Sequence, residues 1–200
     1  KFNGEIISAD SRLVYRGLNI GTGKITKEEM RGMPHHMLDV ANPKKRFSVV
    51  KFQEMGRKII ADIISRGKTA IICGGTGFYI SALVDNIQLP DVPPNPKLRA
   101  TLEKLSADKL FEMLKKLDPR RAREIDPKNK RRVIRAIEIA INADRRGLRT
   151  QINADKKGAC LKWQSLWVGI ILPRERLREK INIRLFARMR QGMVAEAKKL

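Results

Sequence analysis

The chain has 200 residues and a mass of 22.8 kDa, enough for one or two domains with a buried core. Its 43 lysines and arginines against 21 aspartates and glutamates give a net charge of +22, which indicates a polyanionic partner, nucleic acid before an anionic membrane surface. The composition, with 42% apolar residues and no apolar run near the roughly 18 residues of a membrane helix, excludes a disordered tail and a membrane-spanning protein.

Residues 1–90 alternate between strand-like and helix-like segments. GEIISAD predicts a short strand, and the apolar spacing in 47–67 predicts an amphipathic helix with Gly67 as its C-terminal cap. KTAIICGG then predicts a buried strand, and 76–85 a second helix. This alternation indicates an α/β fold with a parallel sheet, whose functional loops lie at the carboxyl ends of the strands.

Residues 91–163 differ in composition from residues 1–90 and contain 20 basic and 10 acidic side chains. A proline-rich entry precedes a helical stretch over 98–117, two Asp-Pro breaks follow, and RRVIRAIEIAINA is helical again. In residues 164–200, SLWVGIILP predicts a return to the sheet as a strand, followed by two basic helices. We therefore expect a core in 1–90 and 164–200 and a helical, basic insertion in 91–163.

Two strand ends carry the first candidate site. Asp10 and Ser11 follow the first strand, and CGGTGFY, with Thr76, joins the later strand to its helix. An aspartate at such a position serves as a general base, a magnesium ligand or a helix N-cap, and position alone does not separate these roles. The CGGTGFY segment is either a ligand-binding turn or only a tight strand-to-helix connection.

Glycines 17, 21 and 23 with Lys24 predict a weak anion site built on exposed backbone amides. Neither Gly23-Lys24 nor Gly67-Lys68 has a glycine at the spacing of a P-loop, so the chain contains no P-loop. His35 and His36 with Asp39 do not favour a metal site, because adjacent residues on a strand point opposite ways.

Arginines dominate the remaining candidates. On a helix, Arg131 and Arg135 lie one turn apart, beside a separate apolar stripe, and Glu138 could pair with Arg135. Arg184 and Arg188 are spaced in the same way. Each pair predicts phosphate contacts, and the alternative for each is an ordinary solvated face.

Six segments in this order and spacing resemble the bacterial tRNA dimethylallyltransferases across essentially the whole chain: ISADSRLVYRGLNIGTGK, PHHMLD, FSVVKFQ, CGGTGFYISALV, NKRRVIRAIE and LREKINIRLFARM. The resemblance implies a P-loop-NTPase-like parallel sheet with an inserted all-helical tRNA-binding subdomain. It also implies transfer of a dimethylallyl group from dimethylallyl diphosphate to N6 of the adenosine 3′ to the anticodon, with Mg²⁺ assisting at the diphosphate.

The family's roles carry over onto single residues of this chain. Asp10 matches the carboxylate that accepts or orients the N6 proton, and Arg184 matches an arginine that holds the diphosphate; these two are the expected catalytic residues. The residues that match tRNA contacts are Asp10, Ser11, Arg12, Leu13, Thr76, Arg99, Arg131, Arg132, Val133, Ile134 and Arg135.

Two residues depart mildly from the family pattern, since Leu13 and Arg131 stand where many members have glutamine. The family begins with a strand and a P-loop and continues beyond Leu200, so the chain resembles an internal fragment that alone is inactive. The missing strand is expected beside GEIISAD.

The expected partners are the tRNA anticodon arm and dimethylallyl diphosphate, for a monomer without membrane contact. Two distant cysteines and the absence of a signal peptide fit the cytoplasm. A non-catalytic tRNA-binding module and a prenyltransferase acting on free adenylate are the alternatives.

Overall fold

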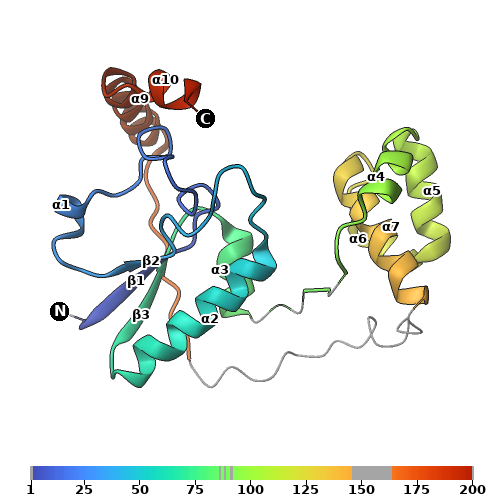
Figure 1. The fold of residues 1–200 in the computed structure, drawn as a ribbon, viewed down its shortest axis with the longest axis horizontal. Helices are drawn as coiled ribbons and strands as arrows, with labels where there is room; N and C mark the ends of the chain where they lie inside the picture. Colours follow the sequence, from blue (N-terminus) through green and yellow to red (C-terminus); the bar gives the residue numbers. More distant parts are fainter. Residues whose placement is uncertain (1, 86, 88, 91, 146–163, 200) are drawn as a thin grey trace. The chain divides into compact units, whose positions relative to one another are not determined.

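A computed structural model describes residues 2–85, 87, 89–90, 92–145 and 164–199 and divides the chain into two compact units. The first unit, here called the sheet unit, combines Lys1–Ile87 with Gly158–Leu200, and the second, here called the helical unit, is Gln88–Lys157 (Figure 1). The finer division of the chain at residues 90 and 163 stays a prediction.

The sheet unit is built on three parallel strands, β1 (Gly4–Ser8), β2 (His35–His36) and β3 (Thr69–Cys73), in the order β2-β1-β3. β1 pairs with β3 along its whole length, from Gly4 opposite Thr69 to Ser8 opposite Cys73. The α/β fold class with a parallel sheet is therefore confirmed. In such a sheet the carboxyl ends of β1 and β3 lie side by side, which brings the two candidate loops together.

The position expected for an upstream strand is wrong. That strand was expected to pair beside GEIISAD, but both edges of β1 are already paired, with β2 on one side and β3 on the other. A strand has only two edges for ladder hydrogen bonds, so a further parallel strand has to join the sheet at β2 or β3.

One layer of helices covers the sheet. α2 (Val49–Ser65) begins at Ser48, whose hydroxyl accepts the Lys51 amide, and α3 (Gly77–Val84) packs against it. The apolar side of α2 enters the core as its spacing predicted, and the ring of Phe52 stacks on Tyr79 at 4.0 Å between centroids. A short helix, α1 (Lys27–Met30), lies in the connection before β2 and is closed by a capping box.

The strand predicted at 165–173 is not observed. The segment has no strand partner among the described residues, and its side chains are open, with Leu166 90% and Ile171 93% exposed. An apolar sequence becomes a strand only where a neighbouring strand offers hydrogen bonds, and none of the described strands does so here. The two helices that follow are observed, as α9 (Arg174–Arg190) and α10 (Met193–Lys198), joined at Gly192 with φ 97°.

The helical unit contains α4 (Pro96–Glu103), α5 (Ala107–Leu117), α6 (Pro119–Glu124) and α7 (Lys130–Arg145). The single helical stretch expected over 98–117 is in fact two helices. Ser106 separates them, because its hydroxyl accepts the Lys109 amide as the N-cap of α5. Asp118 caps α6 in the same way at one of the predicted Asp-Pro breaks.

The helical unit has a core of its own, formed between α5 and α7 with support from α4 and α6. Its fully buried side chains include Leu110, Leu114, Val133 and Ile137. Within the described part of the chain, no helix combines the length and apolarity that crossing a bilayer requires.

Candidate functional site

The ends of β1 and β3 bring Asp10, Ser11 and Thr76 together, although 65 residues separate Ser11 from Thr76. The Ser11 amide donates to Thr76 Oγ1 at 2.9 Å, and the Thr76 hydroxyl donates to Ser11 Oγ at 3.2 Å. Thr76 is also the N-cap residue of α3, but its hydroxyl makes no cap hydrogen bond to that helix. The hydroxyl is therefore directed to the strand-end loop, as a residue of a binding site would be.

The two oxygens of Asp10 have different surroundings. Oδ1 accepts the Arg12 amide at 2.7 Å and the Leu13 amide at 3.4 Å, so Asp10 does act as a local cap. Oδ2 has no hydrogen-bond partner among the described residues and faces Gly75, where an added Cβ would lie 3.7 Å away. The cap and the reactive carboxylate are thus compatible roles, one for each oxygen.

Gly74 allows the two strand ends to approach each other. A Cβ at this position would lie 2.3 Å from the carbonyl oxygen of Ala9, a contact that no side chain tolerates. The Ala9 carbonyl also accepts the Thr76 amide at 3.1 Å, which closes the same turn. The glycine is therefore required for the geometry that places Thr76 beside Ser11.

The loop after Asp10 forms the predicted anion site, but its anion is part of the protein. The backbone amides of Asn19, Ile20 and Gly21 all donate to the carboxylate of Glu196 on α10. Lys24, expected to bind the anion, is nearly buried, and its ammonium donates instead to the Tyr15 carbonyl and to Asp39.

In the helical unit, Glu138 organises two of the expected tRNA-contacting arginines. Its carboxylate is fully buried and accepts Arg99 Nη2 at 2.6 Å, Arg135 Nη1 at 2.5 Å and the Asn95 amide at 2.6 Å. Burial raises the pKa of Glu138, but these donors outweigh it and lower that pKa to about 2. The pairing of Arg135 with Glu138 expected from their spacing is confirmed. Part of the charge of both arginines is therefore neutralised inside the protein.

The segment from 131 to 135 divides into exposed and buried positions. Arg131 and Arg132 are exposed, whereas Val133 and Ile134 are 0% and 5% exposed and pack in the core of the helical unit. Val133 and Ile134 pack in the core and hold the helix that carries the arginines, and a tRNA contact of this segment stays a prediction.

Arg184 lies on α9 and is exposed, without a hydrogen bond or ion pair to any described residue of the strand-end loops. Arg188, one turn further along, lies against the loop backbone, because a Cβ at Gly23 would meet its guanidinium. The two arginines expected to act alike are thus in different environments.

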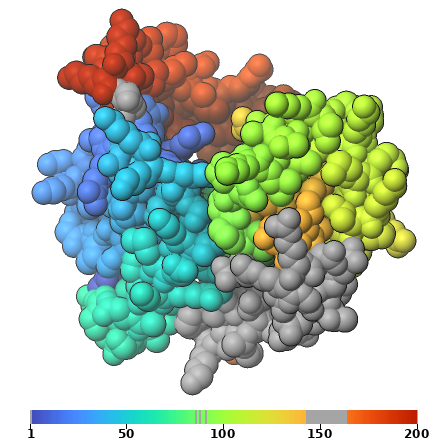
Figure 2. All heavy atoms as spheres, turned by 45° about the vertical axis from the view of Figure 1, so that its right-hand side comes forward, coloured from blue at the N-terminus to red at the C-terminus, as the bar shows by residue number. Residues whose placement is uncertain are grey.

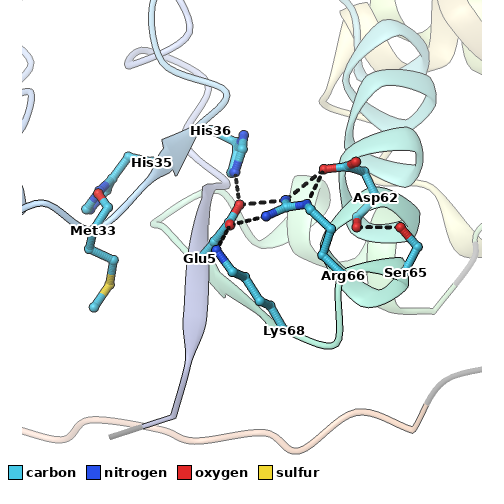
Figure 3. A network of polar contacts seen from close by, with 8 residues as sticks. All are labelled: Glu5, Met33, His35, His36, Asp62, Ser65, Arg66 and Lys68. Atoms are coloured by element: carbon cyan, nitrogen blue, oxygen red, sulfur yellow. Dashed lines mark hydrogen bonds and ion pairs between the residues drawn. The ribbon is translucent and has the colours of Figure 1, made fainter.

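The two histidines point in opposite directions from β2, as expected for neighbours on a strand. His36 contacts Glu5 at 2.7 Å, and His35 contacts the Met33 carbonyl (Figure 3). Glu5 is 3% exposed and also receives Arg66 and Lys68, which together with His36 lower its pKa. This network lies toward the amino-terminal end of β1, away from Asp10, and ties α2 to the sheet.

Glu196 was not recognised in the sequence, and of the partners of Glu138 only Arg135 was expected. The only signal for Glu138 is its spacing from Arg135, and Glu196 is an ordinary charged residue in a basic helix. Their importance follows from partners 39 and 175 or more residues away, which no local pattern records.

Comparison with known proteins gives consistent matches. The family model described as IPP transferase matches residues 13–200. A tRNA dimethylallyltransferase of Anoxybacillus flavithermus is 43% identical over all of this chain and 63% of its own length, and one of Thermomicrobium roseum is 40% identical over all of this chain and 60% of its own. The chain thus spans somewhat less than two thirds of the length of these curated relatives.

Comparison with solved structures gives matches of the same kind. A full-length tRNA isopentenylpyrophosphate transferase from Bacillus halodurans covers the whole chain with 36% identity and a TM-score of 0.64, over 62% of its own chain. A eukaryotic dimethylallyltransferase, studied while acting on tRNA, covers 99% of the chain with 28% identity and a TM-score of 0.82, over 49% of its own chain.

Proposed function

The chain belongs to the IPP transferase family, as its six motifs indicated, and from this we propose that its protein is a tRNA dimethylallyltransferase. The reaction transfers the dimethylallyl group of dimethylallyl diphosphate to N6 of the adenosine 3′ to the anticodon. The observation that carries the proposal is the meeting of Asp10, Ser11 and Thr76 at the carboxyl ends of β1 and β3.

Asp10 is the proposed proton acceptor. The N6 lone pair forms a bond to C1 of the dimethylallyl group while the C1–O bond breaks and its electrons leave with the diphosphate. The exocyclic amine is a weak nucleophile, so a carboxylate that receives its proton raises its reactivity. Oδ2 of Asp10 is the oxygen left for this task, since Oδ1 accepts two backbone amides.

Arg184 is the proposed contact to the leaving diphosphate, where its charge would offset the developing negative charge. Mg²⁺, which the family implies, prefers oxygen donors and often binds through one carboxylate with substrate phosphates and water. The hydroxyl oxygens of Ser11 and Thr76 would offer donors to such a shared site, and Mg²⁺ would neutralise charge on the diphosphate, while Oδ2 of Asp10 is kept for the N6 proton. Among the described residues, no group of three or more His, Cys, Asp or Glu side chains could hold a metal ion.

The tRNA surface is proposed to have two parts. Arg12 and Leu13 with the strand-end residues would receive the target adenosine, and the helical unit would hold the anticodon arm through phosphates. Of the four arginines of this unit that match tRNA contacts, Arg131 and Arg132 are exposed, whereas Arg99 and Arg135 share Glu138 and offer what remains of their donors. A monomer acting in the cytoplasm remains the expectation.

Asp10 variants of the complete protein test the function. Asp10→Asn keeps an oxygen for the Arg12 amide but removes the charge, so it separates the cap from the proton acceptor. We expect loss of prenyl transfer with unchanged tRNA affinity. Wild-type turnover in Asp10→Asn would exclude Asp10 as the proton acceptor. A wild type that binds tRNA but transfers no prenyl group would favour the non-catalytic tRNA-binding module, and transfer to free adenylate without tRNA would favour the adenylate prenyltransferase.

A further inference from the structure

The loop over residues 18–24 contains a nest of backbone amides. The Asn19 and Ile20 amides donate to Glu196 Oε2 at 2.9 and 2.8 Å, and the Gly21 amide donates to Oε1 at 2.8 Å. Three successive N–H groups directed at one carboxylate form an anion-binding concavity of the kind that holds phosphates. In this chain a side chain of α10, 175 residues later in the sequence, occupies it.

The loop holds the nest in shape through its own hydrogen bonds. The Gly23 and Lys24 amides donate back to the carbonyls of Ile20 and Asn19, and the Thr22 hydroxyl donates to Leu18. Gly23 has φ 65°, a conformation that favours glycine. These internal bonds stabilise the loop conformation in which the three amides converge on Glu196.

The hairpin of α9 and α10 contacts the loop through a few side chains among the described residues. Neither helix has a buried side chain among its described residues, and in Figure 2 both stand open on the surface, in red. Three side chains of the hairpin approach the loop: Glu196 in the nest, Arg188 against Gly23, and Met193 near Gly21. Among the described residues, the carboxylate of Glu196 is thus the side chain that joins α10 to this loop by hydrogen bonds.

We propose that Glu196 is a positioning residue, which latches the α9–α10 hairpin to the amide nest and so sets the place of Arg184. Arg184 lies one turn before Arg188 on α9, about 6 Å along the helix axis. The loop that forms the nest comes shortly after residues 10–13 in the sequence. The latch thus connects the element that carries the proposed diphosphate contact with the loop that carries the proposed proton acceptor, and this part rests on the proposed function.

The electrostatics favour an ionised latch. Burial opposes the charge of Glu196, but the three amides and the nearby Lys24 hold its pKa below the usual value. A carboxylate that stays ionised across the physiological range gives a permanent contact rather than a pH switch.

Hydrogen exchange tests the latch in this chain without any activity. Glu196→Ala should speed exchange of the Asn19, Ile20 and Gly21 amides by about tenfold or more, since bonds to a charged group are lost. Glu179→Gln removes a carboxylate from the exposed part of α9 and should leave these amides unchanged. Equal exchange in Glu196→Ala and wild type would overturn the latch.

A double-mutant cycle in the complete protein tests positioning through Arg184. Glu196→Ala should lower kcat about tenfold while the KM for tRNA stays constant, and it should add nothing in an Arg184→Ala background. Multiplying effects of the two substitutions would overturn the positioning role. If the wild type transfers no prenyl group, the proposed function fails and the positioning of Arg184 with it, while the exchange measurement still decides the latch.

Discussion

The guanidinium of Arg99 donates two hydrogen bonds to the buried carboxylate of Glu138, from Nη2 to Oε2 at 2.6 Å and from Nε to Oε1 at 3.1 Å. The contact joins α4 to α7, and Arg135 adds a third donor from α7 itself. A carboxylate with these partners is costly to disturb, because removing one side of a buried pair leaves the other charges uncompensated.

The stability of the helical unit should depend on Glu138 in a pH-dependent way. The pKa of Glu138 falls from an ordinary 4.5 to about 2 in the folded protein, so its contribution is fully present above 4.5 and disappears as the pH falls toward 2. Glu138→Gln should cost about 3 kcal/mol of unfolding free energy at pH 7. The difference from wild type, measured by urea unfolding with NMR signals of α5 and α7, should shrink between pH 5 and pH 2. A constant difference over that range would contradict the role.

Salt dependence of tRNA binding should separate the arginines of α7. Arg131 is exposed and free to contact phosphate, so Arg131→Ala should reduce the slope of log affinity against log salt by roughly 0.7–0.9. Arg135 already pairs with Glu138 and with the Val92 carbonyl. Arg135→Ala should therefore mainly lower the free energy of unfolding and should change the salt slope little. Lys58→Ala on α2 removes the same charge from the other unit and serves as the control. An unchanged slope in Arg131→Ala would exclude this residue from the tRNA surface.

Two glycines of one turn should respond in opposite ways to alanine. Gly74→Ala forces a Cβ to 2.3 Å from the Ala9 carbonyl and should cost about 1–3 kcal/mol, with loss of the contact between Ser11 and Thr76. Gly77→Ala, at the start of α3, meets nothing within 4 Å and should be neutral or stabilising by up to about 1 kcal/mol. Thermal unfolding of the two variants side by side measures the difference; equal stability would contradict the close approach of the strand ends.

The sequence predicted the strand-end site because the position of this site follows from the topology of a parallel sheet. Parallel strands end at one edge, so Asp10 and Thr76 were bound to approach once 4–10 and 68–75 were recognised as strands. Amphipathic spacing likewise located α2 and α7. The strand predicted at 165–173 was wrong, because composition shows the tendency of a segment to pair but not whether a partner strand is present. The contact of Glu196 with the amide nest could not be predicted, since a hydrogen bond between residues 175 positions apart produces no periodic pattern in the sequence.

The role of Arg184 is best tested by comparing it with a neighbour that differs only in place. A charge that stabilises the leaving diphosphate acts mainly in the transition state, so Arg184→Ala in the complete protein should lower kcat by about 10²-fold. A charge that only holds tRNA would instead raise the KM for tRNA. Lys180 lies one turn earlier on α9 and is also exposed, which makes Lys180→Ala the matched control.

Arg188 is unsuitable as that control, although its spacing from Arg184 is the same. Its guanidinium lies against Gly23, so Arg188→Ala would also disturb the docking of α9 on the loop. Steady-state kinetics with both substrates varied distinguish the cases. A loss of kcat in Lys180→Ala as large as in Arg184→Ala would mean that the general charge of α9 matters rather than one arginine. A rise in the KM for tRNA alone in Arg184→Ala would move this residue from the diphosphate to the RNA.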